Sequence, residues 1–357
     1  MRIALDSTLI RPDRLTGVER YSLALVRGLA ELAPGEIVLF RRPDAPEALT
    51  MLPVEQHVAP WTSRVPNEQA WLPLAARRAR ADLLHTLAFP TPILWRGVAA
   101  ITVHDATRWL HPDSVSLGMR YYYGPLYRQA LHRAAAVFTV SESSRNDLIR
   151  AAGLPPERIH VTPNGVEPIF SQARAPEGPR TPYLLAVGTL EPRKNLPALL
   201  DAFRALRRDG RDLDLVLVGR QGWQHSLPLG DLAPHVRLTG AVSDAELAAL
   251  YAGAACFVMP SIYEGFGLPL VEAMASGTPA VASDIPALHE VGGDVVRYAP
   301  PDNAAELARV IASVVDDREG SRERAERARE RALRFTWEAC ARATLDVYRR
   351  IIPSGRR

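Results

Sequence analysis

The segment "AVGTLEPRKNLPALLDAF" (186–203) passes from an apolar run through a polar loop into a helical pattern. The loop contains Arg193 and Lys194, and Asn195 can cap the helix that follows. Apolar residues recur at the spacing of one helix face, and they are Leu199, Leu200, Phe203 and Leu206. A strand joined in this way to a helix is the repeating unit of parallel α/β sheets.

The same alternation of short apolar runs and helical patterns extends along the whole chain. The predicted strands lie within 2–7, 36–40, 82–87, 99–105, 136–142 and 159–164, and then within 183–190, 213–219, 236–240, 256–262, 279–284 and 295–300. Repeated βαβ units of this kind predict an α/β protein with two Rossmann-like, doubly wound domains. The cleft between two such domains is the expected ligand site.

The domain boundaries follow from a break in this pattern. The segment 171–182, "SQARAPEGPRTP", is polar, has three prolines and lacks periodicity, so we interpret it as a linker. We therefore expect an N-terminal domain over 1–170 and a C-terminal domain over 183–335. An amphipathic helix over 336–357 closes the chain.

Composition limits the function classes. The net charge of +3 is too small to indicate nucleic-acid binding, but it suits phosphate-bearing ligands or an anionic membrane surface. Two cysteines, Cys256 and Cys340, cannot define a disulfide framework. The sequence shows neither a signal peptide nor a long apolar span, so a cytoplasmic location is expected.

Lys194 is the only lysine among the 43 Lys and Arg residues of the chain. It stands beside Arg193 at the start of a predicted helix, where free amides and the helix dipole favour an anion. An Arg-Lys pair in a loop is more commonly solvated surface. Because arginine replaces lysine everywhere else, the retained lysine favours an anion-binding role.

A second strand end, "YEGFGLPLVEAMASGTP" (263–279), carries two carboxylates eight positions apart. Glu264 lies in a turn where Gly265 and Gly267 permit close approach of a ligand. Glu272 is expected in the first turn of the next helix, facing the same site, although an acid there can simply complement the helix dipole. Cations for a phosphate and carboxylates for hydroxyl groups together indicate a nucleotide sugar.

These motifs resemble the retaining glycosyltransferases of family 4, which have the GT-B fold. The matching segments follow the order of that family, and they are "TGVERY" (16–21), "VHD" (103–105), "VSESSRNDLI" (140–149), "PNGVEPIF" (163–170), "VGTLEPRKNL" (187–196), "LTGAVSDAELAALY" (238–251) and "YEGFGLPLVEAMASGTPAVAS" (263–283). Because they span nearly the whole chain, the resemblance is specific.

The resemblance implies roles for individual residues. Arg193 and Lys194 would neutralise the diphosphate, Glu264 would contact hydroxyls of the donor sugar, and Glu272 would hold the ribose. His104 would line the donor-sugar and acceptor side of the cleft. The remaining site residues would be Gly17 beside the diphosphate, Gly219, Arg220 and Val242 beside the base, and Gly265, Phe266, Gly267 and Leu268 beside the donor sugar.

The resemblance also bears on cofactors, domain contacts and the donor. Family members work without a bound metal, and their closing helix crosses back to the first domain, as expected here for 336–357. Many members have an arginine directly after the strand-end glycine, whereas this chain has Thr189 there and Arg193 next to the lysine. The "EPRKN" variant resembles mannosyltransferase-like members and favours GDP-mannose as donor.

The expected function is transfer of a hexose, with mannose favoured, to a glycan or lipid-linked saccharide, as in bacterial surface polysaccharide assembly. A transferase that uses UDP-glucose or UDP-N-acetylglucosamine is the first alternative. A nucleotide-sugar epimerase, a non-catalytic nucleotide-sugar-binding protein and a pyridoxal-phosphate enzyme with Lys194 as Schiff base also remain open.

The acceptor side is less defined. The segment "MRYYYGPLYRQALHR" (119–133) interleaves tyrosines with arginines, which suits peripheral contact with an anionic membrane at the inner face of the plasma membrane. A helix with a tyrosine-rich packing face explains the same pattern equally well.

Overall fold

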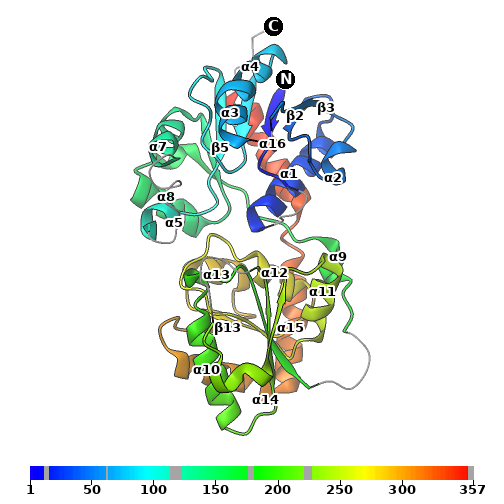
Figure 1. Ribbon diagram of the computed structural model, residues 1–357, viewed down its shortest axis with the longest axis vertical. Coiled ribbons are helices and arrows are strands. Elements are labelled where there is room, and N and C mark those ends of the chain that lie inside the picture. The colour runs from blue at the N-terminus through cyan, green and yellow to red at the C-terminus, as the bar shows by residue number, and fades with distance from the viewer. Residues whose placement is uncertain (12–15, 62, 113–122, 176–180, 221–226, 353–357) are drawn as a thin grey trace. The chain divides into compact units, whose positions relative to one another are not determined.

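A computed structural model describes residues 1–11, 16–61, 63–112, 123–175, 181–220 and 227–352 (Figure 1). The chain divides into two compact units. The first comprises Met1–Gly165 and Trp337–Arg357, and the second comprises Val166–Thr336. Each unit is an α/β layer structure with helices on both faces of a parallel sheet, as the sequence predicts.

The second unit contains a six-stranded sheet in the order β10-β9-β8-β11-β12-β13, with every neighbouring pair parallel. The strands are β8 (Tyr183–Val187), β9 (Asp214–Val218), β10 (Val236–Gly240), β11 (Cys256–Met259), β12 (Ala280–Ser283) and β13 (Arg297–Ala299). The strand order reverses between β8 and β11, and this reversal is the place where doubly wound sheets bind ligands.

Helices cover both faces of this sheet. They are α9 (Pro168–Ser171), α10 (Leu196–Arg208), α11 (Asp244–Gly253), α12 (Leu268–Ala275), α13 (Pro286–Gly292), α14 (Ala304–Asp316) and α15 (Arg318–Ala332), with the 3₁₀ turns η4 (Pro192–Lys194) and η5 (Gly230–His235). Helix α10 packs against α14, and α12 packs against α15. The face predicted for α10 is confirmed, because Leu199, Leu200, Phe203 and Leu206 are all buried.

The first unit contains a seven-stranded sheet in the order β3-β2-β1-β4-β5-β6-β7, again with parallel pairs. The strands are β1 (Ile3–Asp6), β2 (Ile37–Arg41), β3 (Glu55–Val58), β4 (Leu83–Thr86), β5 (Val98–Thr102), β6 (Ala136–Thr139) and β7 (Ile159–Val161). Its helices are α1 (Gly17–Leu32), α2 (Glu47–Thr50), α3 (Arg64–Pro66), α4 (Leu72–Arg78), α5 (Thr107–Leu110), α7 (Tyr123–Arg133), α8 (Glu142–Ala152) and α16 (Trp337–Ile351), with a π-helical turn η1 (Asn67–Trp71) and a 3₁₀ turn η3 (Pro156–Arg158).

The closing helix α16 belongs to the first unit, where it packs against α1. The Tyr348 hydroxyl and the His85 ring form a buried hydrogen bond that joins α16 to β4. The two chain crossings between the units therefore lie at 165–166 and 336–337. Each unit contains a complete sheet of its own.

Two details differ from the sequence expectation. Strand β3 was not predicted, because "EQHV" is a short polar edge strand without an apolar face. The units divide after Gly165, whereas 171–182 was expected to be the linker. Helix α9 lies in the second unit because Phe170 is buried there, edge-to-face with Tyr251 at 5.8 Å.

The ends of β8 and β9 approach so closely that only glycine fits at Gly219. Gly219 has φ +146°, and a Cβ there would lie 1.9 Å from the Gly188 carbonyl oxygen. We predict that Gly219→Ala lowers the free energy of unfolding by more than the ~1–3 kcal/mol of backbone strain alone. Urea denaturation followed by circular dichroism measures the change.

The matched control for this prediction is Gly210→Ala. Gly210 also has a positive φ, +84°, but nothing lies within 4 Å of its Cβ position. Its substitution should cost only the backbone strain. Equal losses in the two variants would contradict the proposed collision, and a Gly219→Ala protein that accumulates only as insoluble material while Gly210→Ala folds would support it.

Candidate functional site

Two loops meet where the strand order of the second unit reverses. The turn η4 follows β8, and the loop 260–267 follows β11. The Ile262 amide donates a hydrogen bond to the Arg193 carbonyl at 3.0 Å and fastens one loop to the other. Side chains from both loops are thereby concentrated at the carboxyl ends of neighbouring strands.

A buried carboxylate lies between the two predicted cations. Glu264 is only 7% exposed. Its Oε1 accepts a hydrogen bond from Lys194 Nζ at 2.6 Å, and its Oε2 accepts one from Arg193 Nη1 at 2.8 Å. Arg193 also donates to Glu191 Oε1 at 2.6 Å and to the Tyr263 carbonyl at 2.9 Å. We call Glu191, Arg193, Lys194 and Glu264 the Glu264 cluster.

The electrostatics of the cluster keep Glu264 ionised. Burial raises the pKa of its carboxyl group, but the charges of Arg193 and Lys194, the hydrogen bond from Lys194 and the nearby Ser261 hydroxyl outweigh this effect and lower the pKa to about 2. At neutral pH the carboxylate is therefore a permanent hydrogen-bond acceptor between two donors. Arg193 makes two hydrogen bonds to Glu191 in its own loop and two to Tyr263 and Glu264 in the other loop, which makes it a positioning residue as well as a cation.

Asn195 supports the cluster in a way that the sequence did not indicate. We expected its side chain to cap α10, but this is wrong, because Asn195 adopts the left-handed conformation, φ 53° and ψ 39°, and makes no side-chain cap bond. Its Nδ2 instead donates to the carbonyls of Pro260 at 3.0 Å and Pro301 at 2.7 Å. Asparagine tolerates this conformation, and its amide holds the turn after Lys194 against the ends of β11 and β13.

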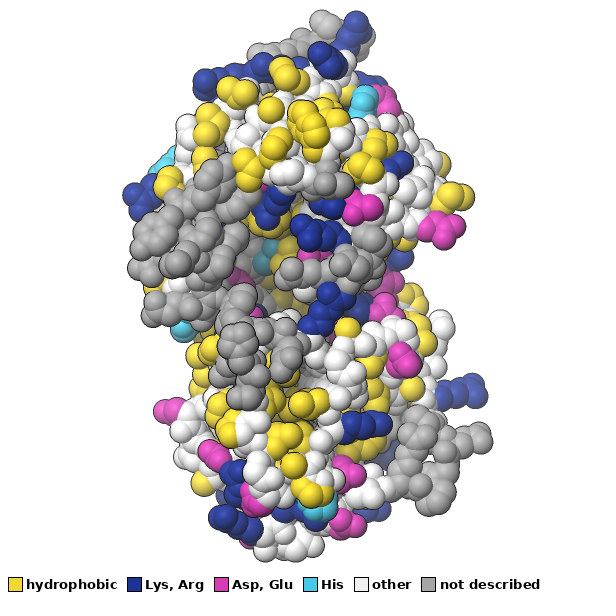
Figure 2. Space-filling view, viewed as in Figure 1, with side chains coloured by type: hydrophobic (Ala, Val, Ile, Leu, Met, Phe, Trp, Pro, Cys, Tyr) yellow, Lys and Arg dark blue, Asp and Glu magenta, His cyan; other side chains and the backbone are white. Residues whose placement is uncertain are grey.

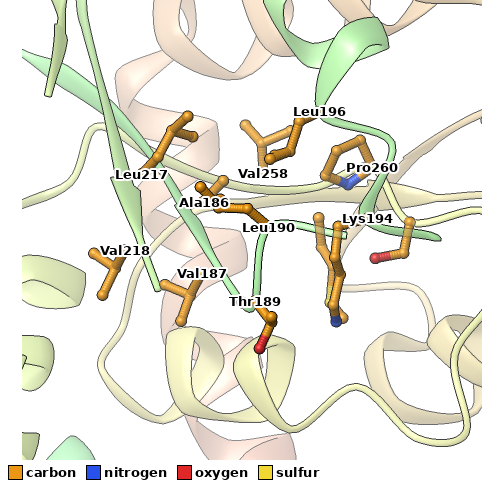
Figure 3. Close-up of a pocket in the computed structure, with 13 residues that line it drawn as sticks. Ala186, Val187, Thr189, Leu190, Lys194, Leu196, Leu217, Val218, Val258 and Pro260 are labelled. Carbon is orange, nitrogen blue, oxygen red and sulfur yellow. The ribbon is translucent and has the colours of Figure 1, made fainter. Parts of the chain in front are cut away.

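Lys194 borders a narrow pocket at the carboxyl end of β8 (Figure 3). The same pocket is lined by Thr189, and Figure 3 shows the Lys194 amine and the Thr189 hydroxyl directed to the same side. A Cβ at Gly188 would lie 3.1 Å from Lys194 Cε, so a glycine there leaves room for the lysine stem. The strand end is thus shaped around one compact cation.

Glu272 lies deeper in its helix than the sequence suggested. Helix α12 begins at Leu268, which puts Glu272 beyond the first turn. The side chain is buried, and its Oε2 accepts a hydrogen bond from the Tyr251 hydroxyl at 2.9 Å. Tyr251 lies on α11, so the carboxylate joins two helices of the same unit. Binding of ribose hydroxyls by Glu272 stays a prediction.

The glycine-rich loop between Glu264 and α12 is held from two sides. Gly267 has φ +104°, and a Cβ there would lie 2.6 Å from Leu288 Cδ2. The Phe266 ring packs edge-to-face on Phe335 at 5.6 Å. The loop backbone at Gly265–Leu268 is therefore fixed directly beside the Glu264 carboxylate, and its predicted contact with a donor sugar remains to be tested.

The residues predicted to lie near the base follow β9 and β10, the two strands on one side of β8. The Gly219 amide donates to the Gly240 carbonyl at 2.9 Å, and the Arg220 carbonyl accepts from Leu190 at 3.0 Å. Val242 precedes the predicted capping box of α11, which is confirmed by reciprocal bonds between Ser243 and Glu246. Gly219 is thus packed against the loop of Lys194, while a base contact for any of the three stays a prediction.

His104 and Gly17 lie in the first unit, and their part in the site also stays a prediction. His104 follows β5, where its Nε2 donates to the Leu87 carbonyl at 3.1 Å. Burial lowers the pKa of its imidazole, which keeps the ring neutral at physiological pH. Gly17 begins α1 after the Thr16 cap, and residues 12–15 before it lie outside the described part of the chain.

Three contributors to the site were missed from the sequence. Glu191 orients Arg193, Ser261 contributes to the pKa of Glu264, and Tyr251 binds Glu272. Glu191 could have been noticed, because it precedes the Arg-Lys pair in the same loop. Ser261 and Tyr251 carry no such signal, since their proximity depends on which strands and helices become neighbours.

Potential metal ligands do not gather within the described ranges. No group of three or more His, Cys, Asp or Glu side chains occurs there. The segment "DLD" (212–214) has the look of a metal-binding motif, but its two aspartates bind different partners. Asp212 binds Arg207 at 3.0 Å, whereas Asp214 begins β9 and faces His235.

Comparison with protein families divides the chain at nearly the same place as the structure. Residues 15–170 match the family described as Glycosyltransferase Family 4, and residues 169–332 match Glycosyl transferases group 1. Together the two matches include every residue of the Glu264 cluster. The second match contains the whole strand-order reversal of the second unit.

Individual relatives cover most of the chain. An O-antigen chain mannosyltransferase B of Escherichia coli is 34% identical over 80% of this chain and 77% of its own length. An MMP alpha-(1->4)-mannosyltransferase of Mycolicibacterium hassiacum is 32% identical over 88% of this chain and 82% of its own. The fold is similar to that of sucrose-phosphate synthase from Thermosynechococcus elongatus, with a TM-score of 0.78, 22% identity and coverage of 98% of this chain and 99% of that one.

The low pKa of Glu264 predicts a specific acid sensitivity. The folded carboxyl stays ionised down to about pH 2, whereas the unfolded one takes up a proton near its ordinary pKa of 4.5. Because the folded state favours the ionised carboxylate, Glu264 stabilises the fold by roughly 3 kcal/mol at most above about pH 5. This contribution disappears as the pH falls towards 2. The free energy of unfolding of Glu264→Gln should therefore lie well below wild type near pH 7 and approach it at low pH.

Urea denaturation at a series of pH values measures this difference. Glu323→Gln is the matched control, because Glu323 is an exposed glutamate of the same unit. This control should retain the pH dependence of the wild type. A gap between Glu264→Gln and wild type that is constant from about pH 7 to pH 3 would contradict the ionised cluster.

Proposed function

The chain belongs to the family 4 glycosyltransferases, and on this premise we propose that it transfers mannose from GDP-mannose to a saccharide acceptor with retention of configuration. The observation that carries the proposal is the Glu264 cluster at the strand-order reversal. Family membership favours glycosyl transfer over epimerisation, simple binding or a pyridoxal-phosphate reaction.

The choice of mannose is supported by the relatives that cover most of the chain. Two of them are described as an O-antigen chain mannosyltransferase and an MMP mannosyltransferase. Another, from Mycobacterium leprae, is described as a phosphatidyl-myo-inositol mannosyltransferase. A glycan or lipid-linked saccharide is therefore the proposed acceptor. If the acceptor is lipid-linked, the protein must reach it at the membrane surface, so the proposal also includes peripheral contact with an anionic membrane.

The cluster suits a donor in which a diphosphate leaves the sugar. Negative charge grows on the diphosphate as the bond to the anomeric carbon breaks, and fixed cations lower the energy of that state. Lys194 presents a compact ammonium group in a pocket at the strand end. Arg193 stands beside it, and the start of α10 adds amide dipoles. We propose that these protein groups, rather than a bound metal ion, stabilise the negative charge that grows on the diphosphate.

The ionised Glu264 suits the sugar end of the same donor. A carboxylate with a pKa of about 2 accepts hydrogen bonds from hydroxyl groups at every physiological pH. It also fixes the positions of both cations before the ligand arrives. We propose that Glu264 binds hydroxyls of the mannosyl group while Lys194 and Arg193 bind the diphosphate.

Lys194→Ala should reduce kcat/KM with GDP-mannose by roughly 10²–10³, the usual effect of losing one donor to a developing charge. Lys194→Arg should also lose activity, because Gly188 and the pocket walls leave room for a narrow ammonium rather than a planar guanidinium. Release of GDP in the presence of acceptor measures both variants.

Arg208→Ala serves as the control for the loss of one positive charge, since Arg208 is exposed at the end of α10 in the same unit. Its activity should equal that of the wild type. Wild-type turnover by Lys194→Arg would show that a positive charge alone suffices and would refute the geometric argument for lysine.

The donor can be identified by thermal denaturation with a panel of nucleotides and nucleotide sugars. A ligand that binds only the native state raises the Tm by mass action. GDP-mannose should give the largest shift, followed by GDP, with smaller shifts for UDP-glucose and UDP-N-acetylglucosamine. A larger shift with a UDP-sugar would identify the chain as a UDP-sugar-dependent transferase instead.

A further inference from the structure

The first unit exposes a group of large apolar side chains on one stretch of the chain. They are between 39% and 51% exposed, and they are Trp61, Val65, Leu74, Ile93 and Leu94. We call these residues, together with the exposed Arg77, Arg78 and Arg96, the apolar face. Figure 2 shows hydrophobic side chains gathered over the region of α3 and α4, with Lys and Arg side chains at its margin.

Helix α4 contributes to this face through residues that recur at helical spacing on its exposed side. Leu74, Arg77 and Arg78 are spaced by three and four positions and are exposed together. The opposite side of the helix is buried against the sheet core through Leu72, Ala75, Ala76 and Ala79. The exposed leucine is therefore not a frayed core residue, because α4 already has a complete inner face.

Hydrogen bonds bind the loop 93–96 to the neighbouring helices. Arg77 Nη2 donates to the Leu94 carbonyl at 2.8 Å, and Gln69 Oε1 accepts from the Ile93 amide at 3.2 Å. From α7, Arg133 donates to the carbonyls of Ile93 at 3.2 Å and Trp95 at 2.6 Å. Ile93 and Leu94 are thus held beside α4 on a fixed surface.

The segment 61–97 carries an excess of positive charge. Residues 61–97 contain Arg64, Arg77, Arg78, Arg80 and Arg96, but only two acids. Glu68 is buried and binds Arg64 at 3.2 Å, and Asp82 accepts a hydrogen bond from the Arg2 amide at 2.8 Å. The exposed apolar groups therefore lie among cations without exposed acids from the same stretch.

We propose that the apolar face is a peripheral binding surface for an anionic lipid bilayer. Leucine, isoleucine and tryptophan side chains enter the boundary between headgroups and acyl chains, and arginines beside them bind the anionic headgroups. Within the described ranges no helix is both long and apolar enough to cross a membrane. The proposed contact is with the surface of the bilayer. This inference rests on the proposed function in one respect, because a lipid-linked acceptor would place the protein at a membrane.

A second copy of the chain suits this surface less well. A two-fold interface would bring the same patch of each copy together, and with it the arginines of both. Lipid headgroups supply the opposite charge instead. Charge complementarity thus favours a bilayer over self-association.

The surface differs from the tyrosine-rich segment that the sequence suggested. Tyr127 of α7 is buried, its hydroxyl bonds the Ala88 carbonyl, and the Arg108 guanidinium lies 4.0 Å from the centre of its ring. Its role is packing, the alternative stated for this segment. Residues 119–122 lie outside the described part of the chain.

The test is co-sedimentation of the full chain with vesicles of phosphatidylcholine alone and with vesicles in which roughly a third of the lipid is phosphatidylglycerol. The wild type should bind the anionic vesicles, bind the neutral ones weakly, and dissociate as salt is added. Leu74→Gln with Leu94→Gln should abolish most of the binding. Each of Arg78→Ala and Arg96→Ala should weaken it roughly fivefold.

Matched controls are taken from exposed positions of the second unit. Leu238→Gln with Leu333→Gln removes two exposed leucines, and Arg208→Ala with Arg237→Ala removes two exposed arginines. Both should bind as the wild type does. Equal losses in these controls, or no binding of wild type to anionic vesicles at low salt, would overturn the proposal.

Two further measurements separate the remaining outcomes. Light scattering that shows a dimer dependent on Leu74 and Leu94 would assign the apolar face to a second copy and refute the lipid contact. The Tm shift with GDP-mannose should be the same in the face variants as in the wild type. A missing shift in the wild type together with intact vesicle binding would refute the proposed donor and leave the lipid contact standing.

Discussion

The buried contact of Glu264 with Lys194 and Arg193 is the interaction on which the site depends. A carboxylate that is 7% exposed is stable only if its charge is matched, and removal of one partner from such a group typically costs 3–5 kcal/mol. The surrounding backbone serves this requirement. Asn195 fixes the turn after Lys194, and the close approach of Gly188 and Gly219 sets the strand ends. The loops of β8 and β11 are consequently fastened at the strand-order reversal.

The same geometry explains the single lysine of the chain. The chain has arginine at its 42 other Lys and Arg positions and retains lysine where the ammonium enters a pocket beside Gly188 and reaches Glu264 Oε1 at 2.6 Å. The arginine next to it does what a planar guanidinium does well, since it binds Glu191, Tyr263 and Glu264 at once. The two cations are adjacent in sequence but differ in task, one compact and one bridging.

Patterns along the sequence predicted what depends on local chemistry. Strand runs, the inner face of α10 and the Ser243–Glu246 capping box are set by neighbours within a few residues, and all were predicted. The bond of Asn195 to Pro301, the contact of Tyr251 with Glu272 and the edge strand β3 depend on which elements become neighbours in space. Local patterns carry no record of such pairings, and for the same reason the bonds of Arg193 to Tyr263 and Glu264 could not be anticipated.

The chemistry of the Glu264 cluster limits which ligands can use it. A phosphate alone would attract Lys194 and Arg193 but leave the Glu264 carboxylate with fewer donors in a buried position, which is costly. A sugar alone would occupy the oxygens of Glu264 but offer Lys194 and Arg193 no anionic acceptor in exchange for their bonds to this carboxylate. A ligand that joins a diphosphate to a hydroxyl-rich sugar replaces both sets of bonds together. This reciprocal requirement, rather than either half alone, is the physical reason to assign the site to a nucleotide sugar.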